Sequence, residues 1–120
     1  MKAIIQRKLG KPDVLEYQEL DTPQPQSNEV LIRVSAASVN HYDILSRRGD
    51  IPHITLPRIV GMDCSGYIEQ YKGDRSDLTI GLPVVVLGTS LGNGNSGGYA
   101  THVCVTQVEL LVLRYKLPKL

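Results

Sequence analysis

The 120-residue sequence is 42% hydrophobic and 21% charged, the ordinary balance of one globular domain. Its formal net charge of +1 provides no field that would attract nucleic acid or an anionic membrane. Cys64 and Cys104 fit neither a disulfide scaffold nor a zinc knuckle, and no apolar run has the length of a signal sequence or a membrane span. We therefore expect a cytoplasmic protein with reduced thiols and no nucleic-acid or membrane partner.

Short strands dominate the chain, because β-branched residues recur at every second position between glycine and proline turns. The clearest case is the strand at 30–37, where Val30, Ile32 and Val34 form one apolar face. The strands expected in chain order are residues 3–7, 15–20, 30–37, 64–70, 84–87, 99–105 and 110–113. Seven short strands predict a mainly β domain, a distorted and partly open β-barrel with one or two short helices.

One helix is predicted at residues 41–48. Asn40 is a good N-cap residue, and Asp43 at the third helical position completes a capping box worth about 1 kcal/mol. Gly49 would end the helix. The following stretch, residues 50–58, contains two prolines and predicts an irregular surface loop. Loops of this kind often border binding sites.

The glycine-rich segment at 92–97 has the G-x-G-x-x-G spacing of a dinucleotide loop and follows the strand at 84–87. Such a loop binds pyrophosphate only when a helix begins at it, whereas residues 98–103 read as another strand. A turn between two strands is therefore the preferred interpretation.

Metal ligands are not clustered in the sequence. His41, His53 and His102 are scattered, and the two cysteines are distant from each other, so no ligand spacing is recognised and no metal site is predicted. A nucleophilic serine is equally unsupported, because Ser65 lacks the first glycine of the G-x-S-x-G elbow.

The order of several short motifs along the chain is informative. They are Met1-Lys2-Ala3, Leu15-Glu16, Pro25, residues 29–34, Ser38-Val39-Asn40, Asp43, Arg48-Gly49, residues 66–69, Gly81 and Gly98-Tyr99-Ala100-Thr101. Together they resemble the N-terminal GroES-like catalytic domain of the medium-chain dehydrogenase/reductase superfamily, and within it the zinc-independent quinone oxidoreductases. The resemblance covers residues 1–120 almost entirely.

This resemblance implies hydride transfer from NADPH to a quinone or enone in a cleft between this domain and a Rossmann domain. The main NADPH platform would lie in that second domain, which the 120 residues do not include. By matching position, Asn40 and Asp43 would be catalytic, and Asn40, His41 and Tyr42 would contact the cofactor. The capping role and the cofactor-facing role of Asn40 are compatible.

Differences from the family pattern indicate which branches of the superfamily the chain does not resemble. Asn40 stands where zinc-dependent relatives have a cysteine ligand, and Met62 and Asp63 stand where they have a histidine and a glutamate. Residues 89–96 are too short, and lack the cysteines, for a structural zinc lobe. The resemblance thus implies a zinc-free enzyme. Ile51 stands where enoyl-thioester reductases of the superfamily have a tyrosine acid, which disfavours that subclass.

Two classes of function stay open. The first is the catalytic part of a zinc-independent NADPH-dependent oxidoreductase, which we expect to be inactive without its second domain. Residues 117–120 resemble the linker that leads into that domain. The alternative is a stand-alone GroES-like binding or assembly module without enzymatic activity. Either could form an oligomer.

Overall fold

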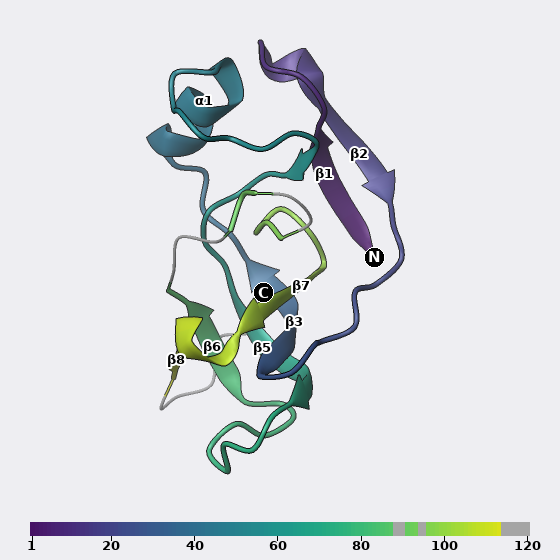
Figure 1. Cartoon of the computed structure of the whole chain (residues 1–120), viewed down its shortest axis with the longest axis vertical. Coiled ribbons are helices and arrows are strands. Elements are labelled where there is room, and N and C mark those ends of the chain that lie inside the picture. Colours follow the sequence, from purple (N-terminus) through teal and green to yellow (C-terminus); the bar gives the residue numbers. More distant parts are fainter. Residues whose placement is uncertain (88–90, 94–95, 114–120) are drawn as a thin grey trace.

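The computed structural model describes residues 1–87, 91–93 and 96–113, which form two antiparallel sheets and one α-helix (Figure 1). The strands are β1 (Lys2–Gln6), β2 (Leu15–Glu19), β3 (Glu29–Ala36), β4 (Arg58–Ile59), β5 (Ser65–Lys72), β6 (Pro83–Val86), β7 (His102–Thr106) and β8 (Leu110–Val112). The helices are α1 (His41–Arg48) and two short 3₁₀ helices, η1 (Pro12–Val14) and η2 (Gln107–Glu109).

The larger sheet has the strand order β7-β3-β5-β6-β8. β3 is an internal strand of this sheet, paired with β5 on one edge and β7 on the other, and its Val30, Leu31 and Ile32 are at most 1% exposed. The main hydrophobic core packs against this sheet; its buried members are Val30, Ile32, Cys64, Ile68, Leu78, Val84, Val86, Leu91, Val103 and Val105. Burial of these side chains supplies the main driving force for folding.

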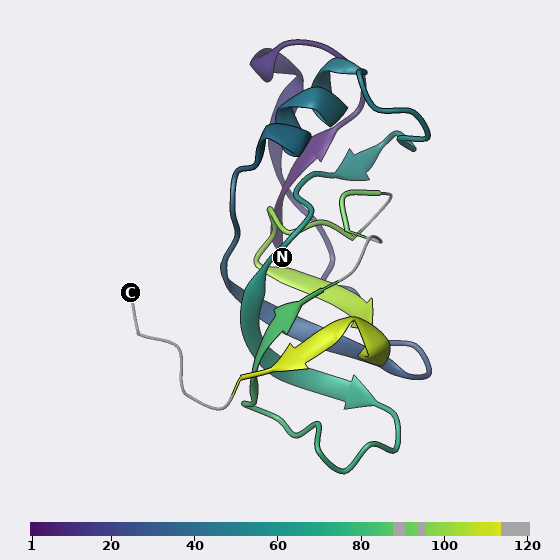
Figure 2. The ribbon, with the colours of Figure 1, turned by 90° about the vertical axis from the view of Figure 1, so that its left-hand side faces the viewer.

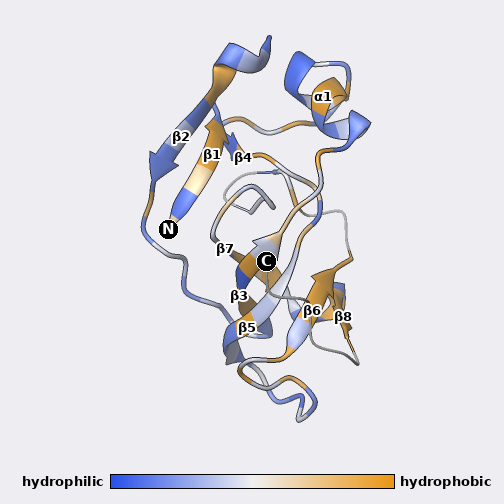
Figure 3. Cartoon of the chain, turned by 180° about the vertical axis from the view of Figure 1, so that it is seen from behind, coloured by the Kyte–Doolittle hydropathy of each residue, from blue (hydrophilic) through white to orange (hydrophobic). Residues whose placement is uncertain are grey.

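The smaller sheet has the order β2-β1-β4 and a second core of Ala3, Ile5 and Ile59. Figure 3 shows β1 and β6 largely in orange and β2 largely in blue, in keeping with the exposed position of β2. The segment before β7 joins the two sheets, because Ala100 bridges to Ala3 and the Ile4 N–H donates to Tyr99 O at 2.9 Å. Figure 2 shows the smaller sheet and α1 at one end of the molecule and the larger sheet at the other.

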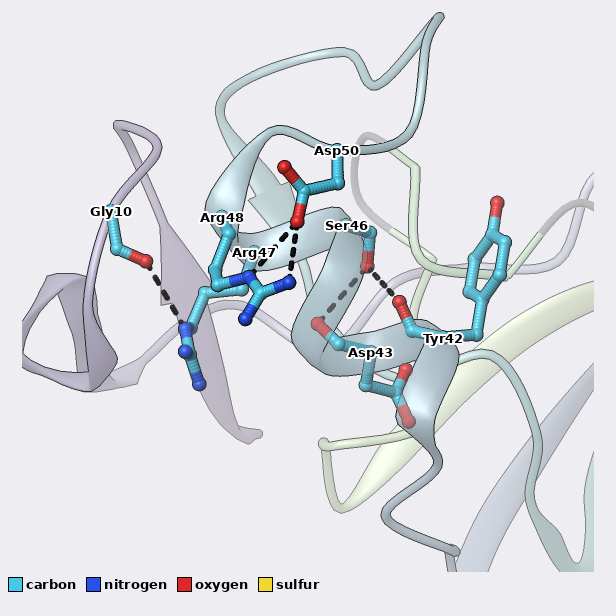
Figure 4. Close-up of polar contacts among 7 residues, drawn as sticks. All are labelled: Gly10, Tyr42, Asp43, Ser46, Arg47, Arg48 and Asp50. Carbon is cyan, nitrogen blue, oxygen red and sulfur yellow. Dashed lines mark hydrogen bonds and ion pairs between the residues drawn. The ribbon is translucent and has the colours of Figure 1, made fainter.

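The predicted mainly β, partly open fold is confirmed: the described strands form two sheets that do not close into a barrel. The helix also has the predicted bounds, beginning at His41 after Asn40 and ending at Arg48 before Gly49. Gly49 adopts the left-handed conformation with φ 99°, which glycine reaches without a Cβ penalty. Figure 4 shows the C-terminal end of α1 tied down, with Arg47 Nε donating to Gly10 O at 3.2 Å and Arg48 paired with Asp50 at 2.6 Å.

Two sequence predictions were wrong in detail. The structure has an eighth strand, β4, at the end of the stretch predicted to be a surface loop, and its Arg58 is only 3% exposed. The predicted strand at 99–105 begins at His102, because Tyr99 and Ala100 bond to the smaller sheet instead. A strand does follow the glycine-rich segment, as predicted; residues 94–95 of that segment and the linker-like residues 117–120 lie outside the described part of the chain.

Candidate functional site

Three segments meet at the N-terminal end of α1. Ser38 to Asp43 lead into the helix, Asp63 lies in the link from β4 to β5, and Tyr99 precedes β7. Glycines permit this close approach. A Cβ added to Gly98 would lie 2.1 Å from Asp63 O, so the segment carrying Tyr99 can pack directly on the segment carrying Asp63.

Asn40 is held by Asp63. Its side-chain Nδ2 donates to Asp63 Oδ2 at 3.0 Å, while the Ser38 backbone N–H donates to Asp63 Oδ1 at 2.9 Å. Both carboxylate oxygens therefore orient the strand-to-helix turn. Because Asn40 is half-buried, its position is fixed while part of its surface remains accessible.

Asp43 ties the helix start to the segment before β7. Its Oδ2 accepts the Asn40 backbone N–H at 2.8 Å, which is the carboxylate half of the predicted capping box. The Tyr99 hydroxyl lies 3.1 Å from the same oxygen and 3.0 Å from Ser38 O. Burial, and then the negative charge of Asp43, raise the pKa of Tyr99 to about 12, so the phenol stays protonated at neutral pH and can donate.

His41 and Tyr42 occupy the first turn of α1 and are exposed, Tyr42 by 42%. Figure 4 shows the side chains of Tyr42 and Asp43 on different sides of the helix, with the Tyr42 ring directed away from the carboxylate. The structure thus brings Asn40 and Asp43 into one network and leaves His41 and Tyr42 as a polar surface beside it.

A cavity of about 160 Å³ lies beside this network. Its walls include Tyr42, Asp43, Ile54, Arg58, Met62 and Leu91. The cavity therefore combines three apolar side chains with one acidic and one basic group, which is the usual mixture in a small-molecule site.

Arg58 is the residue of this site that sequence reasoning missed, since a charged residue after Pro57 was assigned to a surface loop. Its guanidinium is buried against Gln6, Ser46 and the backbone of Gly92. Burial lowers its pKa, and the charge of Asp43 partly offsets this effect. No local pattern could have revealed its burial, because its acceptors lie on distant segments. The sequence places Tyr99 in one of the motifs of the resemblance but carries no local signal for its contact with Asp43.

The donor set at the helix start does not suit zinc. The Asn40 amide is already bonded to Asp63, and Met62 offers only a thioether. Burial, and then the charge of Asp63, raise the pKa of Cys64 to about 12, which keeps its thiol protonated rather than the thiolate that zinc binds. Among the described residues no group of three or more His, Cys, Asp and Glu side chains comes together.

None of the helices in the described ranges is long and apolar enough to cross a membrane.

Comparison with known proteins gives one consistent group of relatives. The family described as alcohol dehydrogenase GroES-like domain matches residues 26–116. Quinone oxidoreductase of Sus scrofa is 33% identical over 119 residues, which cover 98% of this chain and 35% of that protein. Zinc-type alcohol dehydrogenase-like protein C337.11 of Schizosaccharomyces pombe is 39% identical over 70 residues, 57% of this chain and 22% of that protein.

A solved structure of mycobacterial Rv1454c complexed with NADPH is similar with a TM-score of 0.78 and 28% identity. The match covers 94% of this chain and 32% of that chain. This chain thus spans between 22% and 35% of the length of these three relatives.

Proposed function

Because this chain belongs to the alcohol dehydrogenase GroES-like domain family of the medium-chain dehydrogenase/reductase superfamily, we propose that it is the catalytic domain of a zinc-independent oxidoreductase. Its reaction is the NADPH-dependent reduction of quinones or other conjugated carbonyls. The observation that carries the proposal is the network at the start of α1, in which Asp43 and Asp63 fix a half-buried Asn40 beside a cavity. The similarity to quinone oxidoreductase over nearly the whole chain supports the substrate class.

The cofactor, when bound, supplies the hydride. The chain's own residues bind and orient. Asn40, His41 and Tyr42 form the polar surface that the nicotinamide and its ribose face, and Asp63 keeps the Asn40 amide in one orientation. Asp43 holds the helix start, while the protonated Tyr99 hydroxyl keeps its carboxylate in place. Ordering of these groups before the cofactor arrives reduces the entropy lost on binding.

A Rossmann domain is part of this proposal, because the relatives are much longer than this chain and one of them is complexed with NADPH. Asn40 and Met62 stand where the zinc-dependent relatives have a cysteine and a histidine ligand, and this difference supports a reaction that needs no metal. The net charge of +1 and the free, buried Cys64 support a cytoplasmic location with no nucleic-acid partner.

The test uses the protein that contains this chain together with its nucleotide-binding domain. We expect Asn40→Ala to lower kcat/KM for a quinone by roughly tenfold or more, the range typical of a lost positioning contact. Asn40→Ser separates the two roles of Asn40, because serine caps a helix as well as asparagine does but has no amide. The Asn40→Ser protein should therefore be as stable as the unsubstituted protein, while its turnover stays as low as that of Asn40→Ala.

Asn28→Gly is the matched control. Asn28 is exposed in a turn with φ 64°, a conformation that glycine tolerates, so turnover should not change. Unchanged turnover in Asn40→Ala would remove the role assigned to Asn40. If the whole protein showed no NADPH-dependent reduction of any quinone or enone, the alternative of a non-enzymatic binding module would be preferred.

A further inference from the structure

Arg58 lines the cavity beside the helix start with one hydrogen-bond donor unused. A guanidinium has five N–H groups. Nε and one Nη2–H donate to Gln6 Oε1 at 3.0 and 2.9 Å, a second Nη2–H donates to Ser46 Oγ at 3.3 Å, and one Nη1–H donates to Gly92 O at 2.8 Å. Within the described ranges the remaining Nη1–H has no acceptor. Arg58 is 3% exposed, so bulk water does not replace that acceptor as it would on the surface.

All acceptors of Arg58 are neutral oxygens. Among the described residues Arg58 forms no ion pair, although it stays charged because arginine does not lose its proton in proteins. A positive group is thus present in the cavity wall, with one N–H that no described residue accepts. Hydrogen bonds in which the donor is charged are about twice as strong as neutral ones.

Asp43 decides which kind of oxygen suits the cavity. Its buried carboxylate lines the same wall, and its negative charge acts on Arg58. A negative charge is thus already present beside Arg58, so a ligand carboxylate would add a second negative charge next to Asp43 in a poorly solvated space. A neutral carbonyl oxygen accepts the free N–H of Arg58 without that cost.

The size of the cavity limits the ligand. At about 160 Å³ it is close to the ~150 Å³ that accommodates one benzene ring in an apolar protein cavity. Ile54, Met62 and Leu91 provide apolar walls for such a ring. A planar ring or a short conjugated chain fills this space, whereas a fused polycyclic quinone exceeds it.

We propose that this cavity binds the carbonyl end of a compact, neutral, planar conjugated carbonyl compound, with its oxygen hydrogen-bonded to Arg58. This inference narrows the substrate class of the proposed function and rests on it for its meaning in turnover, but the binding itself requires no cofactor. Arg58 acts as an anchor that selects neutral carbonyl compounds over acids.

Three probes of similar size test this selection by NMR titration of the chain: acetophenone, benzoate and toluene. Acetophenone has a conjugated carbonyl, benzoate a carboxylate, and toluene no oxygen. We expect acetophenone to shift the Arg58 Nε–H and Met62 methyl signals and to bind roughly tenfold more tightly than either other probe, the effect of one charge-assisted hydrogen bond. If toluene bound as tightly as acetophenone, the cavity would recognise only apolar surface. If benzoate bound more tightly than acetophenone, the cavity would be an anion site. Either result overturns the proposal.

Two variants complete the test. Arg58→Gln removes the charge and should weaken acetophenone binding roughly tenfold. Because loss of Arg58 also disturbs the buried contacts to Gln6, a second variant leaves Arg58 intact: Ile54→Phe fills the cavity from its half-buried wall and should abolish the acetophenone shifts. The matched control is Ile80→Phe, at a site that is 67% exposed and away from the cavity.

The outcomes separate this inference from the proposed function. Acetophenone binding that is lost in Ile54→Phe, in a protein with no reductase activity, would support the cavity and contradict the proposed function. Quinone reduction by a protein whose Arg58→Gln and Ile54→Phe variants keep full acetophenone affinity would support the proposed function and overturn the role of Arg58.

Discussion

The side-chain amide of Asn40 donates to Asp63 Oδ2 over 3.0 Å, joining the helix start to the β4–β5 link across 23 positions of sequence. Because one partner is charged and Asn40 is half-buried, this contact should couple the two residues by about 1 to 2 kcal/mol. A double-mutant cycle of Asn40→Ala and Asp63→Ala, measured as free energies of unfolding in urea, checks this value. Effects that add to within about 0.3 kcal/mol, as for distant residues, would contradict it.

Gln6 is fully buried and supplies the acceptor for two N–H groups of Arg58. Leucine has a similar size but no acceptor, so Gln6→Leu leaves a buried charge without its main partner and should cost about 3 kcal/mol or more of unfolding free energy. Gln70→Leu, at an exposed position of β5, should stay within about 0.5 kcal/mol. Adding Arg58→Met to Gln6→Leu should recover part of the loss; no recovery would show that the charge is not its cause.

Gly98 and Gly81 require glycine for different reasons, namely close packing at Gly98 and backbone conformation at Gly81. A Cβ at Gly98 would lie 2.1 Å from the backbone oxygen of Asp63, whereas Gly81 has φ +87° and nothing within 4 Å. Gly98→Ala must therefore move backbone at the site and should lower the unfolding free energy by about 3 kcal/mol or more. Gly81→Ala meets conformational strain alone and should lower it by about 1 kcal/mol. A reversed order in thermal or urea unfolding would contradict the close packing at the site.

The Cys64 thiol predicts a loss of stability at alkaline pH. Its pKa is raised from 9.0 to about 12, first by burial and second by the charge of Asp63, and the side chain is 3% exposed. Between these values the native protein holds a proton that the unfolded chain has lost. The contribution of the protonated Cys64 thiol to the unfolding free energy is therefore complete below pH 9 and is lost as the pH rises through 12.

From about pH 8 to about pH 10.5 this linkage should lower the unfolding free energy by about 2 kcal/mol. Cys64→Ala removes that part of the pH dependence, so urea unfolding of both proteins at the two pH values measures it. Parallel pH dependences of the two proteins would exclude Cys64 as the titrating group.

The helix and its cap were predictable because their determinants are local. Asn40, Asp43 and Gly49 lie within one short stretch, and each residue type has a known preference at its position. The strands of the larger sheet were predictable for a similar reason, since apolar residues recur at alternate positions of 30–37. Leu31, which lies on the other face of the strand, is nevertheless buried as well. Two residues cannot show alternation, so β4 carried no signal.

The contacts of the site were not predictable, because they join segments far apart in the sequence. Arg58 is buried by acceptors 52 and 34 positions away, at Gln6 and Gly92. Tyr99 reaches Asp43 across 56 positions. Nothing in the residues near Arg58 or Tyr99 specifies these partners, whereas the carboxylates of Asp43 and Asp63 could at least be placed near the helix start by resemblance.

The position of Tyr99 immediately before β7 links the site to the order in which the fold forms. β7 pairs with β3, and partners in that pairing, such as Val105 and Val30, are separated by most of the chain. Closing so long a loop is slow compared with forming a helix and its cap. We therefore expect the helix start to form early and the hydrogen bond from Tyr99 to Asp43 to form only when β7 pairs with β3, so that this hydrogen bond reports late folding.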